Sequence, residues 1–222
     1  MGFDKLSFDL GGETVLERSV RAFDECPEVD ELVIVTGASS ENAQRAAARC
    51  KKPVRLVKGG STRAESARSG VAAAHGRLVA VHDAARPLVE VPMIEGAVAA
   101  VRQDGRLAGA ICAARSIDTL KLVEGTDIVA TPDRTFYWAA QTPQVFRTRE
   151  VVAAYKAALW DGYQGTDDSS LVERHGGRVR CVECSRDNIK VTIPEDLAVA
   201  EATLEQRLVE EGCGRRPGRD VQ

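Results

Sequence analysis

Residues 78–89 read LVAVHDAARPLV, and this stretch decides how the rest of the chain is interpreted. Its first four residues are apolar, and the polar pair His82-Asp83 follows them at once. A continuous apolar run that ends in polar residues is typical of a buried parallel strand whose faces are covered by helices. Ligands of open α/β sheets bind at the carboxyl ends of such strands. The position of Asp83, directly after the strand, makes it a candidate for binding a ligand.

The residues after this strand suit a ligand that carries phosphate and hydroxyl groups. The Asp83 carboxylate can hold a metal ion or a sugar hydroxyl, and Ala84 leaves room for a ligand against the backbone. Arg86 can meet a phosphate with a two-pronged guanidinium. The alternative is an Asp83–Arg86 ion pair that only fastens a loop. This stretch alone does not decide between the two interpretations.

Strand and helix patterns alternate through the first half of the chain. Apolar runs predict strands over 31–36, 54–58, 78–82 and 107–112. Helix starts are indicated at Thr14, Ser40 and Pro92, and Thr62 with Glu65 has the spacing of a capping box. Strict alternation predicts an α/β fold with a doubly wound, mostly parallel sheet.

The alternation stops after residue 112. Short extended pieces over 117–123, 127–134 and 136–141 have little helical pattern and predict an arm inserted over 115–147. The arm carries Tyr137 and Trp138, and exposed aromatic side chains need a partner surface. We expect the arm to join two copies in a homodimer. The alternative is a lid packed on its own domain.

The last third returns to helices and strands. Helices are predicted over 148–160 and after 166–170, and strands over 178–184 and 188–192. Thr192 and Glu195 have capping-box spacing before a final helix that carries Leu197, Leu204 and Leu208. One domain is expected over 1–212, followed by a disordered tail over 213–222.

Composition excludes several classes of function. The 222 residues carry a net charge of −3, which does not suggest binding to nucleic acid. No apolar run reaches the length of a membrane span, and the start lacks the pattern of a signal peptide, so a cytoplasmic protein is expected. Cys181 and Cys184 form a CxxC within a strand pattern, which points their side chains to opposite faces and argues against a metal site.

Four segments, read together, resemble the 2-C-methyl-D-erythritol 4-phosphate cytidylyltransferases of the non-mevalonate isoprenoid pathway. They match in order and spacing over nearly the whole chain: GGSTRAES (59–66), VHDAARP (81–87), TPQVF (142–146) and DNIKVTIPEDL (187–197). The resemblance implies a fold like that of nucleotide-diphospho-sugar transferases. It also implies transfer of CMP from CTP to a sugar-alcohol phosphate, with release of pyrophosphate. Catalysis would be mostly positioning and charge neutralisation at phosphorus.

Site residues follow from the matched positions. Lys190 takes the place of the family's lysine at the α-phosphate, and Lys5 matches a second family lysine. Mg²⁺ would be held largely by the nucleotide phosphates, so no dedicated metal site is expected. The positions implied to line the cytidine site are Gly60, Ser61, Ser66 and Ala84, and Arg63 in the same motif is expected to be structural.

The substrate side is implied in the same way. Asp83 and Arg86 are expected to bind the sugar-alcohol phosphate, and Thr131 falls where the family has a threonine that contacts it. Arg147 is expected to reach the phosphate of a substrate held by the neighbouring subunit. Asp167 and Asp168 are expected to cap a helix and to shape the rim of the pocket.

The chain departs from the family at its start. The family begins with a buried strand and a glycine-rich loop that resembles PAAGxGxRM, and Met1-Gly2 aligns with the end of that loop. A sheet without this strand would expose the edges of its neighbours. We expect a start assigned at an internal methionine, with this strand and loop encoded upstream. Ribitol 5-phosphate as the substrate, or a catalytically silent protein that binds nucleotide or dimerises, are the alternative functions.

Overall fold

The computed structural model describes residues 4–37 and 40–214, the last four of them as part of a helix only. The first half contains η1 (Lys5–Ser7), α1 (Val15–Glu25), β1 (Leu32–Thr36), α2 (Glu41–Ala48), β2 (Val54–Lys58), α3 (Arg63–Ala73), β3 (Leu78–Val81) and α4 (Val91–Gln103). The second half contains β4 (Gly109–Arg115), β5 (Leu122–Glu124), β6 (Asp127–Ala130), η2 (Arg134–Phe136), β7 (Trp138–Arg147), α5 (Thr148–Trp160), α6 (Asp168–Arg174), β8 (Val179–Glu183) and α7 (Glu195–Gly214).

The central sheet has the order β3-β7-β4-β8. β8 runs parallel to β4, whereas β7 runs antiparallel to both β3 and β4. β3, β4 and β8 therefore share one direction, and β7 alone is reversed. β1 and β2 form a separate parallel pair. The α/β fold with a mostly parallel sheet is confirmed.

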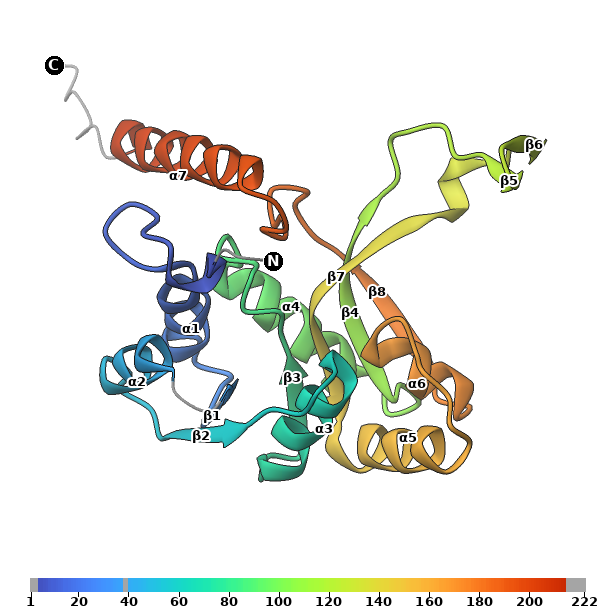
Figure 1. The fold of residues 1–222 in the computed structure, drawn as a ribbon, viewed down its shortest axis with the longest axis horizontal. Coiled ribbons are helices and arrows are strands. Elements are labelled where there is room, and N and C mark those ends of the chain that lie inside the picture. The colour runs from blue at the N-terminus through green and yellow to red at the C-terminus, as the bar shows by residue number, and fades with distance from the viewer. Residues whose placement is uncertain (1–3, 38–39, 215–222) are drawn as a thin grey trace, which may run out of the picture.

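The described strands form two sheets at the place where the sequence predicts one. Among the described residues, β1 pairs only with β2, and β3 pairs only with β7. One edge of β1 and one edge of β3 are therefore without a strand partner there. Figure 1 shows the two parts side by side, with α3 between β2 and β3 along the chain.

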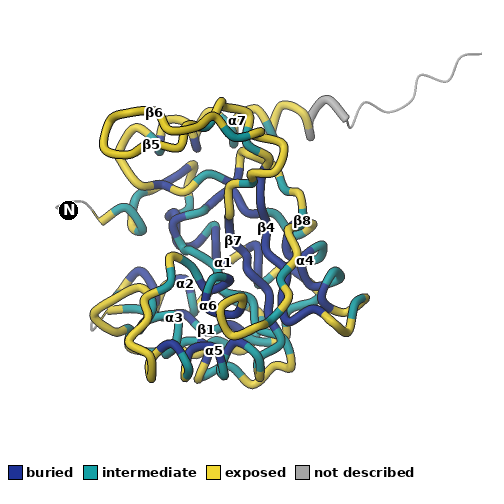
Figure 2. Tube along the Cα trace, turned by 90° about the vertical axis from the view of Figure 1, so that its right-hand side faces the viewer, coloured by how far each residue is buried: buried dark blue, intermediate teal, exposed yellow. Residues whose placement is uncertain are grey.

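Helices cover the central sheet on both faces, because alternate strand residues point to opposite sides. Ala110, Cys112 and Val145 pack with α1, α2 and α4 in one apolar cluster. Ile111 and Phe146 pack with α3, α5 and α6 in a second cluster on the other face. Figure 2 shows β4 and β7 as the most continuously buried strands. The doubly wound arrangement of helices thus follows from the pattern of the strands.

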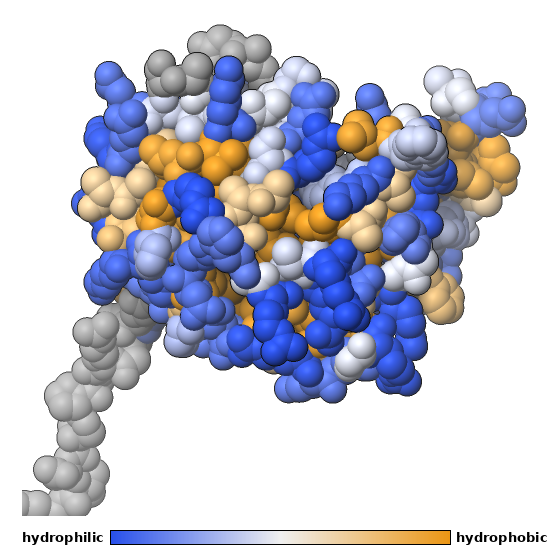
Figure 3. Space-filling view, turned by 90° about the horizontal axis from the view of Figure 1, so that it is seen from below, coloured by the Kyte–Doolittle hydropathy of each residue, from blue (hydrophilic) through white to orange (hydrophobic). Residues whose placement is uncertain are grey.

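An arm leaves this body where β4 and β7 continue beyond the sheet. Arg115 pairs with Trp138 at its base, and β5 and β6 form an antiparallel hairpin at its tip. The arm contains fewer residues than the predicted 115–147, because residues 141–146 of β7 are buried in the central sheet. Apolar side chains are exposed along the projecting part, and Figure 3 shows apolar surface at the right-hand end of the molecule, where the arm lies. They are Ile117, Leu122, Val123, Ile128, Val129, Phe136 and Tyr137.

Residues 188–192 do not form the predicted strand. The Val191 N–H donates to the Ala85 carbonyl at 2.7 Å, and the Val191 carbonyl accepts from Lys5 Nζ at 2.9 Å. These contacts come from a loop and from a side chain, so no strand ladder forms. The side chain of Val191 is fully buried in a third apolar cluster with Leu88 and Leu197.

The final helix begins differently from its prediction. The Asp196 carboxylate, and not that of Glu195, accepts from the backbone N–H groups of Thr192 and Ile193 at 2.6 and 3.0 Å. Leu197 is buried, whereas Leu208 is 68% exposed. α7 runs to Gly214, and the rest of the predicted tail lies outside the described residues. None of the helices described has the combination of length and apolarity that crossing a membrane requires.

The start of α7 provides a test of this hydrogen bonding. Asp196→Ala removes the acceptor of two backbone N–H groups and should lower the free energy of unfolding by about 1 kcal/mol. Glu195→Ala is the matched control, because its exposed side chain makes neither bond. Urea denaturation of the two variants measures the difference. Equal losses in both variants would contradict the assignment.

Candidate active site

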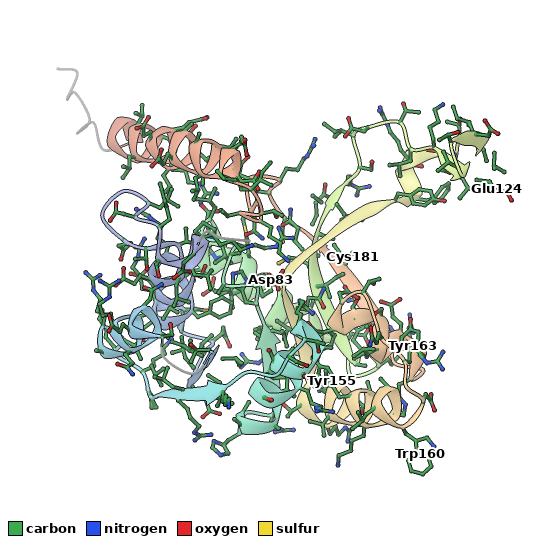
Figure 4. The ribbon with its side chains drawn as sticks, in the orientation of Figure 1. Asp83, Glu124, Tyr155, Trp160, Tyr163 and Cys181 are labelled. Atoms are coloured by element: carbon green, nitrogen blue, oxygen red, sulfur yellow. The ribbon has the colours of Figure 1, made fainter. Side chains whose placement is uncertain are left out.

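The Asp83 carboxylate lies between two cations at the carboxyl end of β3. Its Oδ2 is 2.8 Å from Lys190 Nζ, and its Oδ1 accepts from Arg63 Nε at 3.2 Å. The Asp83 N–H donates to Thr142 Oγ1 at 3.0 Å, which fixes the backbone below the carboxylate. Figure 4 shows Asp83 near the centre of the molecule, above the carboxyl end of β3. The partners of Asp83 are thus Lys190 and Arg63, and not the neighbouring Arg86.

Electrostatics keep Asp83 ionised. Burial opposes its charged form, but the hydrogen bond from Lys190 and the charge of Arg63 outweigh that cost and lower its pKa. The side chain of Lys190 is 41% exposed, whereas that of Asp83 is 17% exposed. A ligand can therefore reach the ammonium more easily than the carboxylate.

Lys5 contacts the segment 188–191, which carries Lys190. Lys5 donates to the carbonyl of Val191, the residue directly after Lys190. Arg86 holds the same segment from the other side, because its Nη1 donates to the Asn188 carbonyl at 2.6 Å. The Asn188 side chain is fully buried and donates to Gln141 Oε1 at 3.0 Å and to the Thr142 carbonyl at 2.9 Å. Tertiary contacts, and not a strand, thus place the lysines.

The loop before α3 and the first turn of that helix bring together Gly60, Ser61 and Ser66, three of the four residues predicted to bind nucleotide. The fourth, Ala84, lies in the loop after β3. The Gly60 N–H donates to Ser66 Oγ at 3.1 Å, and Ser61 donates its N–H and its hydroxyl to Glu65 Oε2. Only one of the two hydrogen bonds of the predicted capping box forms between described residues. The Thr62 hydroxyl accepts from the Glu65 N–H, whereas the Glu65 carboxylate accepts from the Ser61 N–H. A Cβ at Gly60 would lie 2.2 Å from the Cβ of Glu65, so close packing alone requires glycine there.

Arg63 joins this loop to Asp83 and to the interior. Its Nη2 donates to Asp168 Oδ2 at 2.9 Å, and the hydroxyl of Tyr155 donates to Asp168 Oδ1. Asp168 is 1% exposed, so these partners and not water compensate its charge. Burial and the nearby Asp168 charge raise the pKa of Tyr155, which therefore stays protonated. The sequence did not predict the Arg63–Asp168–Tyr155 contacts, because they join three separate helices.

Asp167 and Asp168 have different roles although they are neighbours. Asp167 caps α6, because its carboxylate accepts from the Ser170 N–H at 2.9 Å, and it also accepts from Gln144 Nε2 at 2.8 Å. The predicted cap is therefore correct for Asp167. Asp168 points inward to Arg63 and Tyr155 instead.

His82 packs beside the site as a neutral ring. Its Nδ1 is 3.0 Å from Thr142 Oγ1, its Nε2 is 3.3 Å from the Arg86 carbonyl, and its ring lies 5.0 Å from that of Phe23. Burial disfavours the imidazolium and lowers its pKa to about 4. His82 thus supports Thr142, which in turn holds the backbone of Asp83.

Metal ligands do not gather around Asp83. Within residues 4–37 and 40–214, no three His, Cys, Asp or Glu side chains are placed to hold a metal ion. Both oxygens of Asp83 are already occupied by cations. The CxxC does not form a site either, because Cys181 is exposed while the thiol of Cys184 faces that of Cys112 and raises its pKa.

Comparisons with known proteins agree with this geometry. A family model described as 2-C-methyl-D-erythritol 4-phosphate cytidylyltransferase matches residues 1–206. The chain belongs to this family. A cytidylyltransferase of that name from Symbiobacterium thermophilum is 43% identical over 209 residues, which cover 92% of this chain and 86% of that protein.

Solved structures of cytidylyltransferases in the family have the same fold. The 4-diphosphocytidyl-2C-methyl-D-erythritol synthase of Anaerococcus prevotii superposes with a TM-score of 0.84 at 30% identity, covering 90% of this chain and 93% of that one. The cytidylyltransferase of Thermus thermophilus gives a TM-score of 0.77 at 30% identity, covering 90% and 94%. This cytidylyltransferase is therefore a nucleotidyltransferase, and the comparisons support neither the ribitol 5-phosphate nor the silent alternative.

Arg147 does not lie in the site of this cytidylyltransferase. Its guanidinium donates to the carbonyls of Val101 and Leu107 at 2.8 and 2.9 Å, at the end of α4. β7 runs from the arm through Thr142 and ends at Arg147, and the five residue steps from Thr142 to Arg147 span about 16 Å. Within its own chain Arg147 therefore holds the end of α4, and its reach to a substrate of a neighbouring subunit stays a prediction.

Thr131 lies on the arm, away from Asp83 of its own chain. Its Oγ1 accepts from Lys121 Nζ at 2.8 Å, and both residues are exposed. Its contact with substrate stays a prediction that depends on the position of the arm against a second copy.

The neutral His82 predicts how stability depends on pH. The pKa of about 4 in the folded state lies below the ordinary value of 6.5. The contribution of neutral His82 to the free energy of unfolding should therefore be fully present above pH 6.5. It should fall by about 3 kcal/mol as the pH drops towards 4, and this group should cause no further loss below that pH. His82→Gln should flatten this part of the profile, and the exposed His175→Gln should not. Urea denaturation between pH 4 and 7 measures it, and identical profiles for wild type and His82→Gln would contradict the assignment.

Proposed function

We propose that this chain transfers the cytidylyl group of CTP to 2-C-methyl-D-erythritol 4-phosphate and releases pyrophosphate, in isoprenoid biosynthesis by the non-mevalonate route. The observation that carries the proposal is the partly exposed Lys190 held on Asp83, beside the loop 59–66. This arrangement offers a cation for phosphate, a carboxylate for hydroxyl groups and a backbone loop for a base. Family membership favours this substrate pair.

The reaction needs charge neutralisation more than acid–base chemistry. A phosphate oxygen of the substrate attacks the α-phosphorus of CTP, a new P–O bond forms, and the bond to pyrophosphate breaks. Negative charge grows on the pentavalent phosphorus and on the leaving group. Lys190 can turn from Asp83 to the α-phosphate, because its side chain is 41% exposed and flexible. A cation already placed beside the phosphorus stabilises the transition state without reorganisation.

Lys5 is proposed to meet the phosphates with Lys190. Its Nζ now donates to the Val191 carbonyl, one residue beyond Lys190, so both ammonium groups belong to one region of the site. A neutral carbonyl holds an ammonium less strongly than a phosphate does. Lys5 can therefore exchange that bond for a phosphate oxygen while its backbone stays in place.

The loop 59–66 and the β3 loop are proposed to bind the nucleoside. Gly60, Ser61 and Ser66 offer backbone groups and hydroxyls for hydrogen bonds with a base and a ribose. Ala84 has no bulky side chain and lies directly after Asp83. Arg63 ties the two loops together through Asp83.

Asp83, with Thr131 of the arm, is proposed to bind the sugar-alcohol phosphate. Asp83 accepts hydrogen bonds, as a polyol requires. Arg86 contributes by holding the Asn188 carbonyl, and its Nε is a buried donor without a partner among the described residues. We propose that Arg86 serves the substrate side through this support of the segment 188–191.

Mg²⁺ is proposed to arrive with the nucleotide. Nucleotide-bound Mg²⁺ needs only one or two carboxylates or none, because phosphates and waters complete its octahedral shell. The ion would add positive charge at the triphosphate.

A homodimer joined by the arm is proposed as the working form. The exposed apolar side chains of the arm, led by Phe136 at 82% and Ile128 at 63%, have no covering surface within the described part of the chain.

A cytoplasmic location is proposed from the five described cysteines, all of which are free thiols, as is typical in reducing compartments.

Substitution of Lys190 tests the chemical role. Lys190→Ala should lower kcat by about 10²–10³-fold with the fold intact, because a positioned charge at the transition state is lost. Lys156→Ala, an exposed lysine on α5, is the control and should stay active. Steady-state kinetics with CTP and Mg²⁺ measure both variants. A Lys190→Ala enzyme with near-normal kcat would remove Lys190 from the mechanism.

Substitution of Phe136 tests the dimer. Phe136→Asp places a charge on the apolar arm and should produce monomers, because a buried unpaired charge is costly at an interface. Trp160→Asp is the matched control, because this side chain is 92% exposed but lies at the end of α5, far from the arm. Sedimentation equilibrium measures the association. If wild type is a monomer at assay concentration, or if both variants dimerise, the arm is not the interface.

A further inference from the structure

Asp168 is a buried carboxylate that does not touch the proposed reaction centre but is joined to it through one side chain. Arg63 donates from Nη2 to Asp168 at 2.9 Å and from Nε to Asp83 at 3.2 Å. Tyr155, on α5, donates its hydroxyl to the other oxygen of Asp168. Figure 4 shows Tyr155 below Asp83, beside α3. A single guanidinium thus links the interior with the site.

Stability alone does not account for this buried charge. Desolvation of a buried ion pair costs about as much as the pair gains, so apolar replacements are often neutral or stabilising. α6 already has its N-terminal cap in Asp167, so it does not need Asp168 for that purpose. What Asp168 adds is a fixed direction for the guanidinium of Arg63.

Without Asp168, Arg63 would have another partner available. Its side chain is 40% exposed and starts α3, directly after the loop proposed to bind nucleotide. A free guanidinium binds phosphate with two parallel hydrogen bonds. Burial disfavours the cation, but Asp168 and Asp83 outweigh that effect and raise the pKa of Arg63, so its charge is permanent. The hydrogen bond from Arg63 to Asp168 directs the guanidinium so that it stays in contact with the Asp83 carboxylate.

The two cations at Asp83 are not equivalent. The Lys190 side chain is 41% exposed and has Asp83 as its ion-pair partner, whereas Arg63 is also held by a carboxylate that is 1% exposed. When Lys190 turns to a phosphate, Asp83 keeps only Arg63. The loss of that partner as well would leave a largely buried carboxylate free to move.

We infer that Asp168 and Tyr155 are positioning residues, which hold Arg63 on Asp83 so that Asp83 stays in place for the sugar-alcohol substrate while Lys190 binds the α-phosphate. This inference rests on the proposed roles of Asp83 and Lys190. The chain of contacts runs from Tyr155 through Asp168 and Arg63 to Asp83, and only its last member meets the substrate.

Kinetics of the full-length protein test the inference. Asp168→Asn keeps the shape of the side chain but removes its charge, and Tyr155→Phe removes only the hydroxyl. Both should raise KM for 2-C-methyl-D-erythritol 4-phosphate by about tenfold and change KM for CTP by less than about twofold. A merely structural role would lower the thermal midpoint and leave this ratio of KM values unchanged.

Arg63→Lys extends the test, because lysine keeps the charge but cannot reach both carboxylates as a fork. It should reproduce the kinetics of Asp168→Asn. The double variant Arg63→Lys, Asp168→Asn should be no worse than the poorer single variant, since both changes break the same link. Additive effects in the double variant would overturn the inference.

Asp167→Asn is the matched control. It alters the neighbouring carboxylate of the same helix, which bonds Gln144 and Ser170 but not Arg63. Its KM for either substrate should change by less than about twofold even if stability falls. An equal rise in KM for Asp167→Asn would overturn the inference, since it would show a general effect of α6. If Asp168→Asn does not fold, the nearly isosteric Tyr155→Phe decides.

Asp83→Asn separates this inference from the proposed function. If it raises KM for the sugar-alcohol phosphate while Asp168→Asn and Tyr155→Phe do not, the inference fails and the role of Asp83 stands. If Asp83→Asn leaves that KM unchanged, the proposed role of Asp83 fails, and the inference fails with it.

Discussion

The site depends on one carboxylate shared by two cations. Asp83 meets Lys190 at 2.8 Å and Arg63 at 3.2 Å, and each contact joins Asp83 to a different part of the chain. Lys190 connects it with the C-terminal segment before α7, and Arg63 connects it with the loop before α3 and, through Asp168, with α6. A partly buried carboxylate needs such partners to stay charged. The fold brings them together from positions 107 and 20 residues away.

The sequence predicts the α/β class and most elements because their causes are local. The apolar run 78–81 ends in polar residues and is β3, and Thr14 and Ser40 cap helices as their side chains indicate. Predictions fail where tertiary contacts replace local ones. Residues 188–192 have a strand pattern, yet their partners are Ala85, Lys5 and Arg86. At the start of α7 the carboxylate that accepts from the Thr192 N–H belongs to Asp196, one residue beyond the predicted Glu195. The sequence pattern does not distinguish between these two neighbouring carboxylates.

The site could be predicted in part. Motif resemblance points to Asp83, Lys190 and Lys5, which lie in one region of the structure. It does not separate residues that face the site from residues that support it. Arg147 follows a motif residue but faces the carbonyls at the end of α4, and Arg63, expected to be structural, contacts Asp83 directly. Asp168 and Tyr155 lie on other helices, so no local pattern links them to the site.

In the proposed mechanism, Lys190 exchanges Asp83 for the α-phosphate while Arg63 keeps Asp83 in place. A crystal structure of the protein with CTP and Mg²⁺ tests this most directly. We expect Lys190 Nζ at about 2.8 Å from an α-phosphate oxygen, with the Arg63–Asp83 and Arg63–Asp168 contacts retained. A bound CTP whose α-phosphate lies out of reach of Lys190, or is held by Arg63 released from Asp83, would contradict it.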